Sequence, residues 1–397
     1  MNIFLDALSR TPTISIGTQA LIIGSMQIIN RYQEGVEFIM LTANERFDDA
    51  VFGKLGYKVT MVRRPRSQLG TIRALRSITG NVNAVVSAWG DGYITTPPHR
   101  MLQKCLFLKP KYGPCVLFPS SVGPFATGRL KRTLAKKALG VFNRIMARDT
   151  VTLQYLRDLG FDDAILVPDT AFVLEPAPRQ RVEEILAEEG VPTGSSFIGV
   201  NVSQLLNVRY TKRTGASYAK LIADVASRLH EISQLSVLLI PHQIYPESLG
   251  SVDQEARCSS DGDDRYAVSE VMKRLGQGGF VIPIMGEYSC REYKGLIARC
   301  EVFVGGRMHS VIAAVSSGVP AAIMQYSHKA PGTMAMIGLG DFVWDIGAPE
   351  EDLSGMLDAL WHSRLSLRSQ LEQTMPAIKR DAWQAGELLL DALQNYT

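Results

Sequence analysis

The chain has 397 residues, of which 46% are hydrophobic and 20% charged. This balance is typical of a globular protein with two or three domains and excludes disordered, collagen-like and coiled-coil chains. The formal net charge is only +3, whereas a dedicated nucleic-acid-binding protein carries a much larger basic excess.

The five cysteines are scattered and never spaced as Cys-x-x-Cys. This usage is typical of a reducing compartment and argues against a disulfide framework or a cysteine-rich zinc site. The first residues, MNIFLDALSR, lack the basic and apolar regions of a signal peptide. The early apolar stretch 14–29 is too polar and too short to span a bilayer. We therefore expect a soluble, cytoplasmic protein.

Short apolar runs rich in Val and Ile alternate with longer helical patterns in the first half of the chain. The runs that predict strands are 36–42, 83–89, 114–120 and 163–169, and helical patterns occupy 20–32 and 130–147. Runs that are apolar on both faces are typical of a parallel sheet covered by helices. The alternation indicates successive β-α-β units.

A proline-containing break at 174–181 interrupts this pattern, which then resumes. The later predicted elements are strands at 197–203, 236–242, 280–286, 301–306 and 320–326, helices at 218–232 and 310–317, and a helical tail after Pro349. We predict an α/β protein with two Rossmann-like parallel-sheet domains, 1–178 and 179–397, facing a cleft. The last helices are expected to pack back on the N-terminal domain. Ligands of such sheets bind beyond the carboxyl ends of the strands.

The segment 302–332 carries the strongest chemical signal. A predicted strand ends in two glycines, and Arg307 and His309 follow before an apolar helix. Glycines allow a sharp turn, and a helix N-terminus attracts anions. Lys329 lies after the next predicted strand, beside Gly and Pro. These residues predict a site where a small anion undergoes proton transfer; the alternative is that His309 only caps a helix.

Two further residues are expected at strand ends. Arg148 ends an apolar run, and Asp149 follows it as a candidate helix N-cap. Arg148 either binds an anion or is simply paired with Asp149 or Asp169. His242 ends the predicted strand 236–242, where it either contacts a ligand or is a structural histidine.

Three segments resemble the polysaccharide pyruvyltransferase family in matching order. They are FPSSVGPF, ARDTVTLQYLRDLGF…VPDTAFVLEP and GGRMHSVIAAVSSGVPAAIMQYSHKAPGTMAMIGLGD. The resemblance covers about residues 15–345 and is most specific in 302–341. It implies a two-domain architecture like that of GT-B glycosyltransferases. It also implies transfer of pyruvate from phosphoenolpyruvate to a sugar, as a ketal bridging two hydroxyls, in the biosynthesis of a cell-surface polysaccharide or glycolipid.

By this resemblance, Arg148, His309 and Lys329 match the family's basic residues at the phosphoenolpyruvate site, and Arg307 lies next to them. His309 and Arg148 are the expected catalytic residues, with His309 as general acid or base. Arg148, Arg307 and Lys329 are expected to hold the carboxylate and phosphate of the donor. Phosphoenolpyruvate is then the donor substrate, and no metal or other cofactor is expected.

The sequence departs from the family pattern on the acceptor side, which we assign to the N-terminal domain. Thr18 stands where the family commonly has an acid, and the family's glycine cluster reads Trp89-Gly90-Asp91-Gly92. Asp91 is expected to bind hydroxyls of the acceptor, because a carboxylate accepts hydrogen bonds, and His242 is a second candidate for that contact. The acceptor is expected to be a sugar or a lipid-linked glycan.

Two other functions compete with pyruvyl transfer. A GT-B glycosyltransferase with a nucleotide-sugar donor would need a carboxylate for the ribose, and Glu292 is a candidate. A catalytically silent carbohydrate-binding protein is the third alternative. The Asp261-Gly262-Asp263 triplet resembles a metal-binding DxD motif, but its serine-rich surroundings favour a solvated loop.

The stretch 129–148 contains seven basic residues and no acidic one. Such a pattern is typical of a solvated helix face. It is also typical of a face that approaches anionic lipid headgroups or the pyrophosphate of a lipid-linked sugar. Peripheral association with the inner face of the plasma membrane is therefore one expectation.

Overall fold

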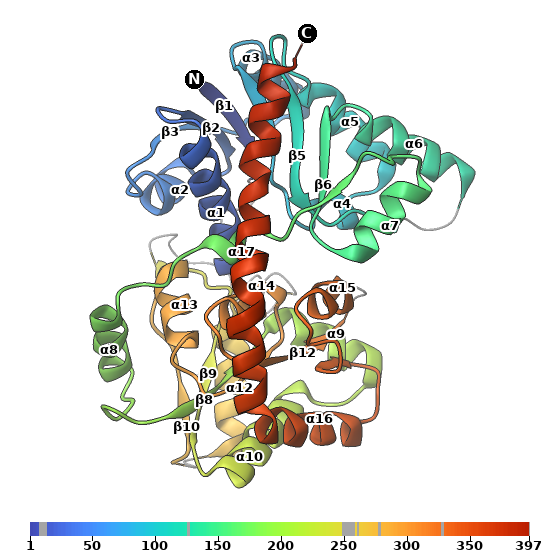
Figure 1. Ribbon diagram of the computed structural model, residues 1–397. Coiled ribbons are helices and arrows are strands. Elements are labelled where there is room, and N and C mark those ends of the chain that lie inside the picture. The colour runs from blue at the N-terminus through green and yellow to red at the C-terminus, as the bar shows by residue number, and fades with distance from the viewer. Residues whose placement is uncertain are drawn as a thin grey trace. The chain divides into compact units, whose positions relative to one another are not determined.

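The computed structural model of the chain (Figure 1) describes residues 1–7, 14–124, 128–247, 259, 262–276, 279–326 and 329–396. It divides into two compact units. Unit 1 comprises Met1–Thr13, Leu21–Leu174 and Ile378–Thr397, and unit 2 comprises Ile14–Ala20 and Glu175–Ala377. The boundary after Leu174 falls in the proline-containing break. The short segment Ile14–Ala20 groups with the second half of the chain, and Ile378–Thr397 groups with the first.

Unit 1 contains a seven-stranded sheet with the order β3-β2-β1-β4-β5-β6-β7. The strands are β1 (Asn2–Asp6), β2 (Glu37–Thr42), β3 (Lys58–Arg63), β4 (Ala84–Ser87), β5 (Cys115–Ser120), β6 (Arg144–Ala147) and β7 (Ile165–Leu166). All of their pairings are parallel. The central strands β4 and β5 are buried along their whole length, as expected for apolar strands covered on both faces.

The sequence pattern missed two strands of unit 1, β1 and β3, and assigned a third, β6, to a helix. It predicted one helix over 130–147. That helix is wrong beyond its first part, because α6 ends at Leu139 and Gly140 caps it before β6 begins. Val141, Ile145 and Met146 are compatible with either structure by hydrophobicity, so the pairing of β6 with β5 and β7 decides.

The helices of unit 1 connect these strands. They are α1 (Ile16–Tyr32), whose first residues belong to unit 2, α2 (Glu45–Phe52), α3 (Gln68–Thr79), α4 (Gly92–Thr95), α5 (Pro98–Leu108), α6 (Arg129–Leu139), α7 (Thr150–Asp158) and the 3₁₀ turn η1 (Thr170–Val173). Buried residues of α3, α5 and α6 share one core cluster with β4, β5 and β6. These three helices therefore form a single layer on one face of the sheet.

Unit 2 contains a six-stranded parallel sheet with the order β10-β9-β8-β11-β12-β13. The strands are β8 (Phe197–Asn201), β9 (Ser236–Ile240), β10 (Val281–Pro283), β11 (Phe303–Gly305), β12 (Ala321–Gln325) and β13 (Val343–Asp345). The first five lie within predicted strands, whereas β13 was missed. Two parallel α/β sheets confirm the predicted fold class.

The helices of unit 2 lie between its strands and after them. They are α8 (Arg179–Glu188), α9 (Gln204–Thr214), α10 (Tyr218–Ser233), α12 (Asp264–Leu275), α13 (Cys290–Ile297), α14 (Met308–Val315), α15 (Lys329–Met336), α16 (Glu350–His362) and α17 (Arg364–Gln394), whose last part belongs to unit 1. The helical tail after Pro349 is confirmed. Throughout the described ranges, no helix is both long enough and apolar enough to cross a bilayer.

Candidate functional site

Arg148 lies at the carboxyl edge of the unit 1 sheet, directly after β6, and only 5% of it is exposed. Its Nε donates to Ser121 Oγ at 2.7 Å and its Nη1 to Asp169 Oδ2 at 2.8 Å, while its Nη2 donates to the carboxylate of Asp91. Burial lowers the pKa of Arg148, but the nearby carboxylates, led by Asp91 and Asp169, outweigh burial and raise it above the ordinary value. The guanidinium is therefore permanently charged.

Asp149 holds this cluster to α7. Its carboxylate caps the helix by accepting from the backbone N of Thr152 at 2.7 Å, and it also accepts from Ser121 Oγ at 2.7 Å. The predicted N-cap is confirmed. Since Ser121 also accepts from Arg148, one hydroxyl links the cap to the guanidinium.

Asp91 is the accessible member of the Arg148 cluster. Its side chain is 43% exposed, compared with 3% for that of Asp169. It follows Gly90, whose φ of +54° places the backbone in the left-handed region, and a Cβ on Gly90 would lie 3.5 Å from Arg148 Nη1. The Arg148–Asp169 pair is thus buried, whereas the Asp91 carboxylate that contacts Arg148 is partly accessible to solvent.

A second polar group occupies the ends of β1 and β4 in unit 1. Asp6 is 4% exposed, accepts from Ser87 Oγ at 2.9 Å and forms an ion pair with Lys104 Nζ at 2.7 Å. Lys104 Nζ also lies 3.2 Å from the centroid of the Trp89 ring. Burial, only partly offset by Asp6, lowers the pKa of Lys104. The sequence patterns did not single out this group.

In unit 2, Asn201 ties three strand ends together. Its Nδ2 donates to the carbonyl of Ile240 at 2.8 Å, and its Oδ1 accepts from the backbone N of Gly306 at 3.1 Å and from Ser310 Oγ at 3.2 Å. The ends of β8, β9 and β11 are therefore fixed relative to each other. His309 is the second residue of α14, directly beyond this junction.

Arg307 is the N-cap residue of α14 and is engaged with Asp264. Its Nε and Nη2 donate to the two carboxylate oxygens at 2.8 and 2.7 Å, and Asp264 is fully buried. Asp264 also accepts from the backbone N of Gln204 at 2.8 Å and of His242 at 2.9 Å. Two of the three guanidinium nitrogens of Arg307 thus hold a buried carboxylate rather than face solvent.

His242 lies in the same unit and is only 3% exposed. Its backbone O accepts from the backbone N of Ile16 at 3.1 Å, so the segment before α1 runs beside it. Burial, followed by the electrostatic influence of His309 and Arg307, lowers the pKa of His242 well below 6.5. This burial favours the structural interpretation of His242.

The start of α1 also packs against His309. A Cβ built on Gly17 would lie 2.5 Å from His309 Cβ and 2.6 Å from both Cγ and Nδ1. Both residues belong to unit 2. The absence of a side chain at Gly17 is therefore what makes room for the imidazole.

The remaining sequence-derived candidates are only partly described. Lys329 is the first residue of α15, and its side chain lies outside the described parts of the structure. Asp261 also lies outside them, whereas Asp263 is buried and caps α12, contrary to the expected solvated loop. Glu292 accepts from Arg181 Nε at 2.9 Å and completes a capping box with Ser289. In the described ranges, no group of three His, Cys, Asp or Glu side chains could hold a metal.

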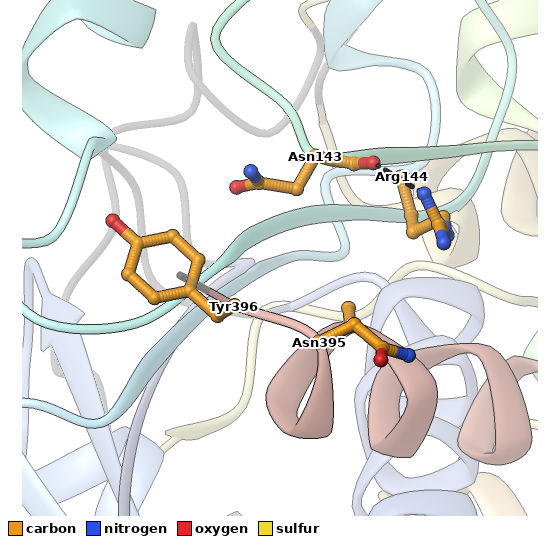
Figure 2. A pocket seen from close by; sticks show the side chains of 5 residues that line it. Asn143, Arg144, Asn395 and Tyr396 are labelled. Atoms are coloured by element: carbon orange, nitrogen blue, oxygen red, sulfur yellow. Dashed lines mark hydrogen bonds between the residues drawn. The ribbon is translucent and has the colours of Figure 1, made fainter.

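One cavity of about 160 Å³ lies in unit 1, away from these residues. Figure 2 shows Asn143, Arg144, Asn395 and Tyr396 around it. Asn143 and Arg144 stand at the amino-terminal end of β6, opposite the edge that carries Arg148. Arg144 is already paired with Asp391 at 2.8 Å. The cavity therefore does not belong to the strand-end clusters.

Comparison with known proteins assigns the family. Residues 16–328 match the model of the family described as polysaccharide pyruvyl transferase. The chain belongs to this family. It is also 23% identical over 302 residues to the amylovoran biosynthesis protein AmsJ of Erwinia amylovora, covering 73% of this chain and 67% of that protein. The resemblance inferred from the sequence motifs is confirmed.

Solved structures of similar fold are GT-B enzymes and their relatives. Alr3699/HepE of Anabaena in complex with UDP-glucose matches with a TM-score of 0.63 and 11% identity, over 99% of both chains. A glycosyltransferase of Rickettsia africae matches with a TM-score of 0.61 and 10% identity, also over 99% of both chains. UDP-GlcNAc 2-epimerase of Methanocaldococcus jannaschii matches with 0.58 and 12%, over 90% and 92%. At these identities the matches show the fold, and the predicted GT-B-like architecture is confirmed.

Sequence reasoning found one of the partners that organise these family residues and missed the others. Asp169 was expected as a possible partner of Arg148, and their ion pair at 2.8 Å confirms it. Ser121 lies in the quoted FPSSVGPF motif, but the motif gave it no role. Asp264 carried no signal, because an acid at a helix start is common. Gly17 lies about 290 residues before His309 in the sequence, and no local pattern links the two.

Proposed function

We propose that this chain transfers pyruvate from phosphoenolpyruvate to a sugar, forming a ketal that bridges two hydroxyls. The single observation that supports this most strongly is the family match over residues 16–328. The reaction forms two bonds from sugar oxygens to C2 of the donor and breaks the bond from C2 to the phosphate oxygen. Of the two hydroxyl protons, one ends on C3, which becomes the methyl group, and one leaves with inorganic phosphate.

His309 is assigned the proton transfer at C3 or at a sugar hydroxyl. It lies in the first turn of α14, after the fixed junction of β8, β9 and β11. An imidazole at a fixed strand end can accept and return a proton without large movement. Arg307 supports His309 by holding the buried Asp264. Lys329 is assigned to binding the negatively charged phosphate of the donor.

Arg148 is assigned to the donor carboxylate, with Asp91 as its exchangeable partner. In the structure Arg148 is already neutralised by Asp91 and Asp169. Because the Asp91 side chain is 43% exposed, an incoming carboxylate can take its place at the guanidinium. The released Asp91 is then available to accept hydrogen bonds from acceptor hydroxyls.

A thermal-shift titration tests the donor. Phosphoenolpyruvate at 100 times its dissociation constant adds about 2.7 kcal/mol of stability, and Arg148→Met is expected to abolish the shift. Asp91→Asn removes the competing carboxylate and is expected to keep or increase it. Stabilisation by UDP-glucose in place of phosphoenolpyruvate would contradict the proposal and favour glycosyl transfer.

A turnover assay tests the chemistry. Phosphate release from phosphoenolpyruvate is measured with and without sugar acceptors, and release is expected only with a suitable acceptor. His309→Gln is expected to lose turnover while keeping the thermal shift with phosphoenolpyruvate. Near-wild-type turnover of His309→Gln would refute its assigned role. We further propose that the product belongs to exopolysaccharide biosynthesis, because the relative AmsJ is described as an amylovoran biosynthesis protein.

A further inference from the structure

Charge is distributed very unevenly along the chain. The segment 63–148 contains sixteen Lys and Arg residues and a single carboxylate, Asp91, although the whole chain carries a net charge of only +3. The rest of the chain therefore holds 26 basic and 38 acidic residues. A net charge near zero thus hides one strongly basic region, which lies entirely in unit 1.

The fold gathers this charge on one surface. Helices α3, α5 and α6 bury one side in a common core cluster, and α5 contacts both of the others. In Figure 1, α5 and α6 lie side by side in unit 1. The opposite sides of the three helices and their flanking residues carry eleven exposed bases, which we call the basic layer: Arg66, Arg73, Arg76, Arg100, Lys109, Lys111, Arg129, Lys131, Arg132, Lys136 and Lys137.

The basic layer is not neutralised within the part of the chain that the structure describes. Among the described residues of the segment 63–148, Lys104, Arg144 and Arg148 form ion pairs, and all three lie outside the layer. None of the eleven bases pairs with a described carboxylate. Their mutual repulsion costs stability unless an external anion compensates it.

Exposed apolar side chains accompany these bases. Leu69 and Leu130 are each 71% exposed, Tyr112 is 61% exposed and Leu106 is 60% exposed. These are four of the five most exposed large apolar side chains of the described residues. They lie on α3, α5 and α6 or, for Tyr112, just after α5. Exposed leucines beside Lys and Arg side chains are typical of a protein surface that enters the boundary between lipid headgroups and acyl chains.

We propose that the basic layer docks on an anionic lipid surface, with Leu106 and Leu130 entering the headgroup boundary. Charge complementarity selects the partner, because each Lys or Arg near such a surface adds a favourable contribution. A second copy of the same face is disfavoured by like charge. The phosphates of a nucleic acid would attract the Lys and Arg side chains, but they offer no apolar region for the exposed leucines to enter. The inference does not rest on the proposed function, since vesicle binding requires no donor or acceptor.

Vesicle co-sedimentation tests the proposal with the full chain. The wild-type protein is expected to bind phosphatidylcholine vesicles that contain phosphatidylglycerol and to ignore phosphatidylcholine alone. Binding is expected to weaken strongly at about 0.5 M salt, where charges are screened beyond about 4 Å. Arg73→Glu/Lys137→Glu is expected to lower the affinity at least tenfold.

The matched control reverses the charge of two exposed basic residues of unit 1 that lie outside the basic layer. Arg46→Glu/Lys54→Glu makes the same change in net charge on and after α2 and is expected to bind as the wild type does. Leu106→Ser/Leu130→Ser is expected to weaken vesicle binding severalfold while leaving binding to heparin unchanged. Circular dichroism verifies that each variant is folded.

Three results would overturn the proposal. The first is a folded wild-type protein that does not bind phosphatidylglycerol vesicles. The second is equal weakening by the layer variant and the control variant, which would mean that net charge alone acts. The third is binding to an RNA oligonucleotide without binding to vesicles, which would assign the basic layer to nucleic acid. None of these results bears on pyruvyl transfer, which is measured separately.

Discussion

Gly17→Ala is the sharpest test of how the candidate site is built. The added methyl group would lie 2.5 to 2.6 Å from three atoms of His309, whereas carbon atoms in contact are ordinarily about 3.5 to 4.0 Å apart. The imidazole must therefore retreat by about 1 Å. A displacement of this size at a reacting group lowers the rate by about 100-fold.

The sign of the change in stability distinguishes displacement of His309 from an effect of helix propensity. Gly17 lies in the first turn of α1, and in a helix alanine is favoured over glycine by up to about 1 kcal/mol. Propensity alone would therefore stabilise the variant. We expect instead that overpacking lowers the free energy of unfolding by about 1 to 3 kcal/mol, and that kcat falls far more than this loss explains.

The assay combines turnover with a spectroscopic signature. Phosphate release is measured at a temperature at which the variant is folded, and the ring signals of the six histidines are recorded by NMR. The His309 signal, identified by its absence in His309→Gln, is expected to shift in Gly17→Ala. Gly355→Ala is the control, because Gly355 lies in α16 with no atom within 4 Å of a built Cβ. A folded Gly17→Ala variant with kcat within threefold of wild type would refute the reasoning.

Three further predictions concern buried groups. Asp264→Asn removes the charged partner of Arg307, whose side chain is only 13% exposed, and is expected to lower the free energy of unfolding in urea by about 3 to 5 kcal/mol. The control Asp358→Asn, at an accessible ion pair, is expected to cost less than about 1 kcal/mol. Equal losses in the two variants would contradict this prediction. Burial lowers the pKa of His242, so below about pH 6.5 the unfolded chain binds a proton that the folded chain does not. The free energy of unfolding is therefore expected to fall by up to about 1.4 kcal/mol for each pH unit below about 6.5. His242→Gln should remove that part of the slope, and an unchanged slope in urea titrations would exclude His242 as its source. Finally, burial raises the pKa of the thiols of Cys105 and Cys290 to about 12, so both are expected to resist alkylation at pH 8 until the chain is unfolded, as followed by mass spectrometry of the peptides.

The sequence by itself determined the fold class and the family. Apolar runs such as 114–120 and 197–203 predicted buried strands, because they are short, apolar on both faces and alternate with longer helical patterns along the chain. The motif around His309 was recognisable because the glycines, the cation and the helix start are contiguous in the chain. The prediction of one helix over 130–147 failed because it depended on distant residues. An apolar run such as 141–147 fits a helix or a strand until a neighbouring strand pairs with it.

The tertiary structure decided what each charged group does. Local patterns placed Arg148 and Arg307 at strand ends and offered Asp169 as one possible partner of Arg148. They could not decide for that pair, and they could not show that Asp91 also contacts Arg148 or that Asp264 occupies Arg307. Nor could they reveal that Gly17 makes room for His309, or that three separate helices expose their bases on one layer. Each of these facts is a contact between residues that are far apart in sequence. Burial and ion pairing depend on such neighbours, whereas the periodicity that fixes helices and strands is local.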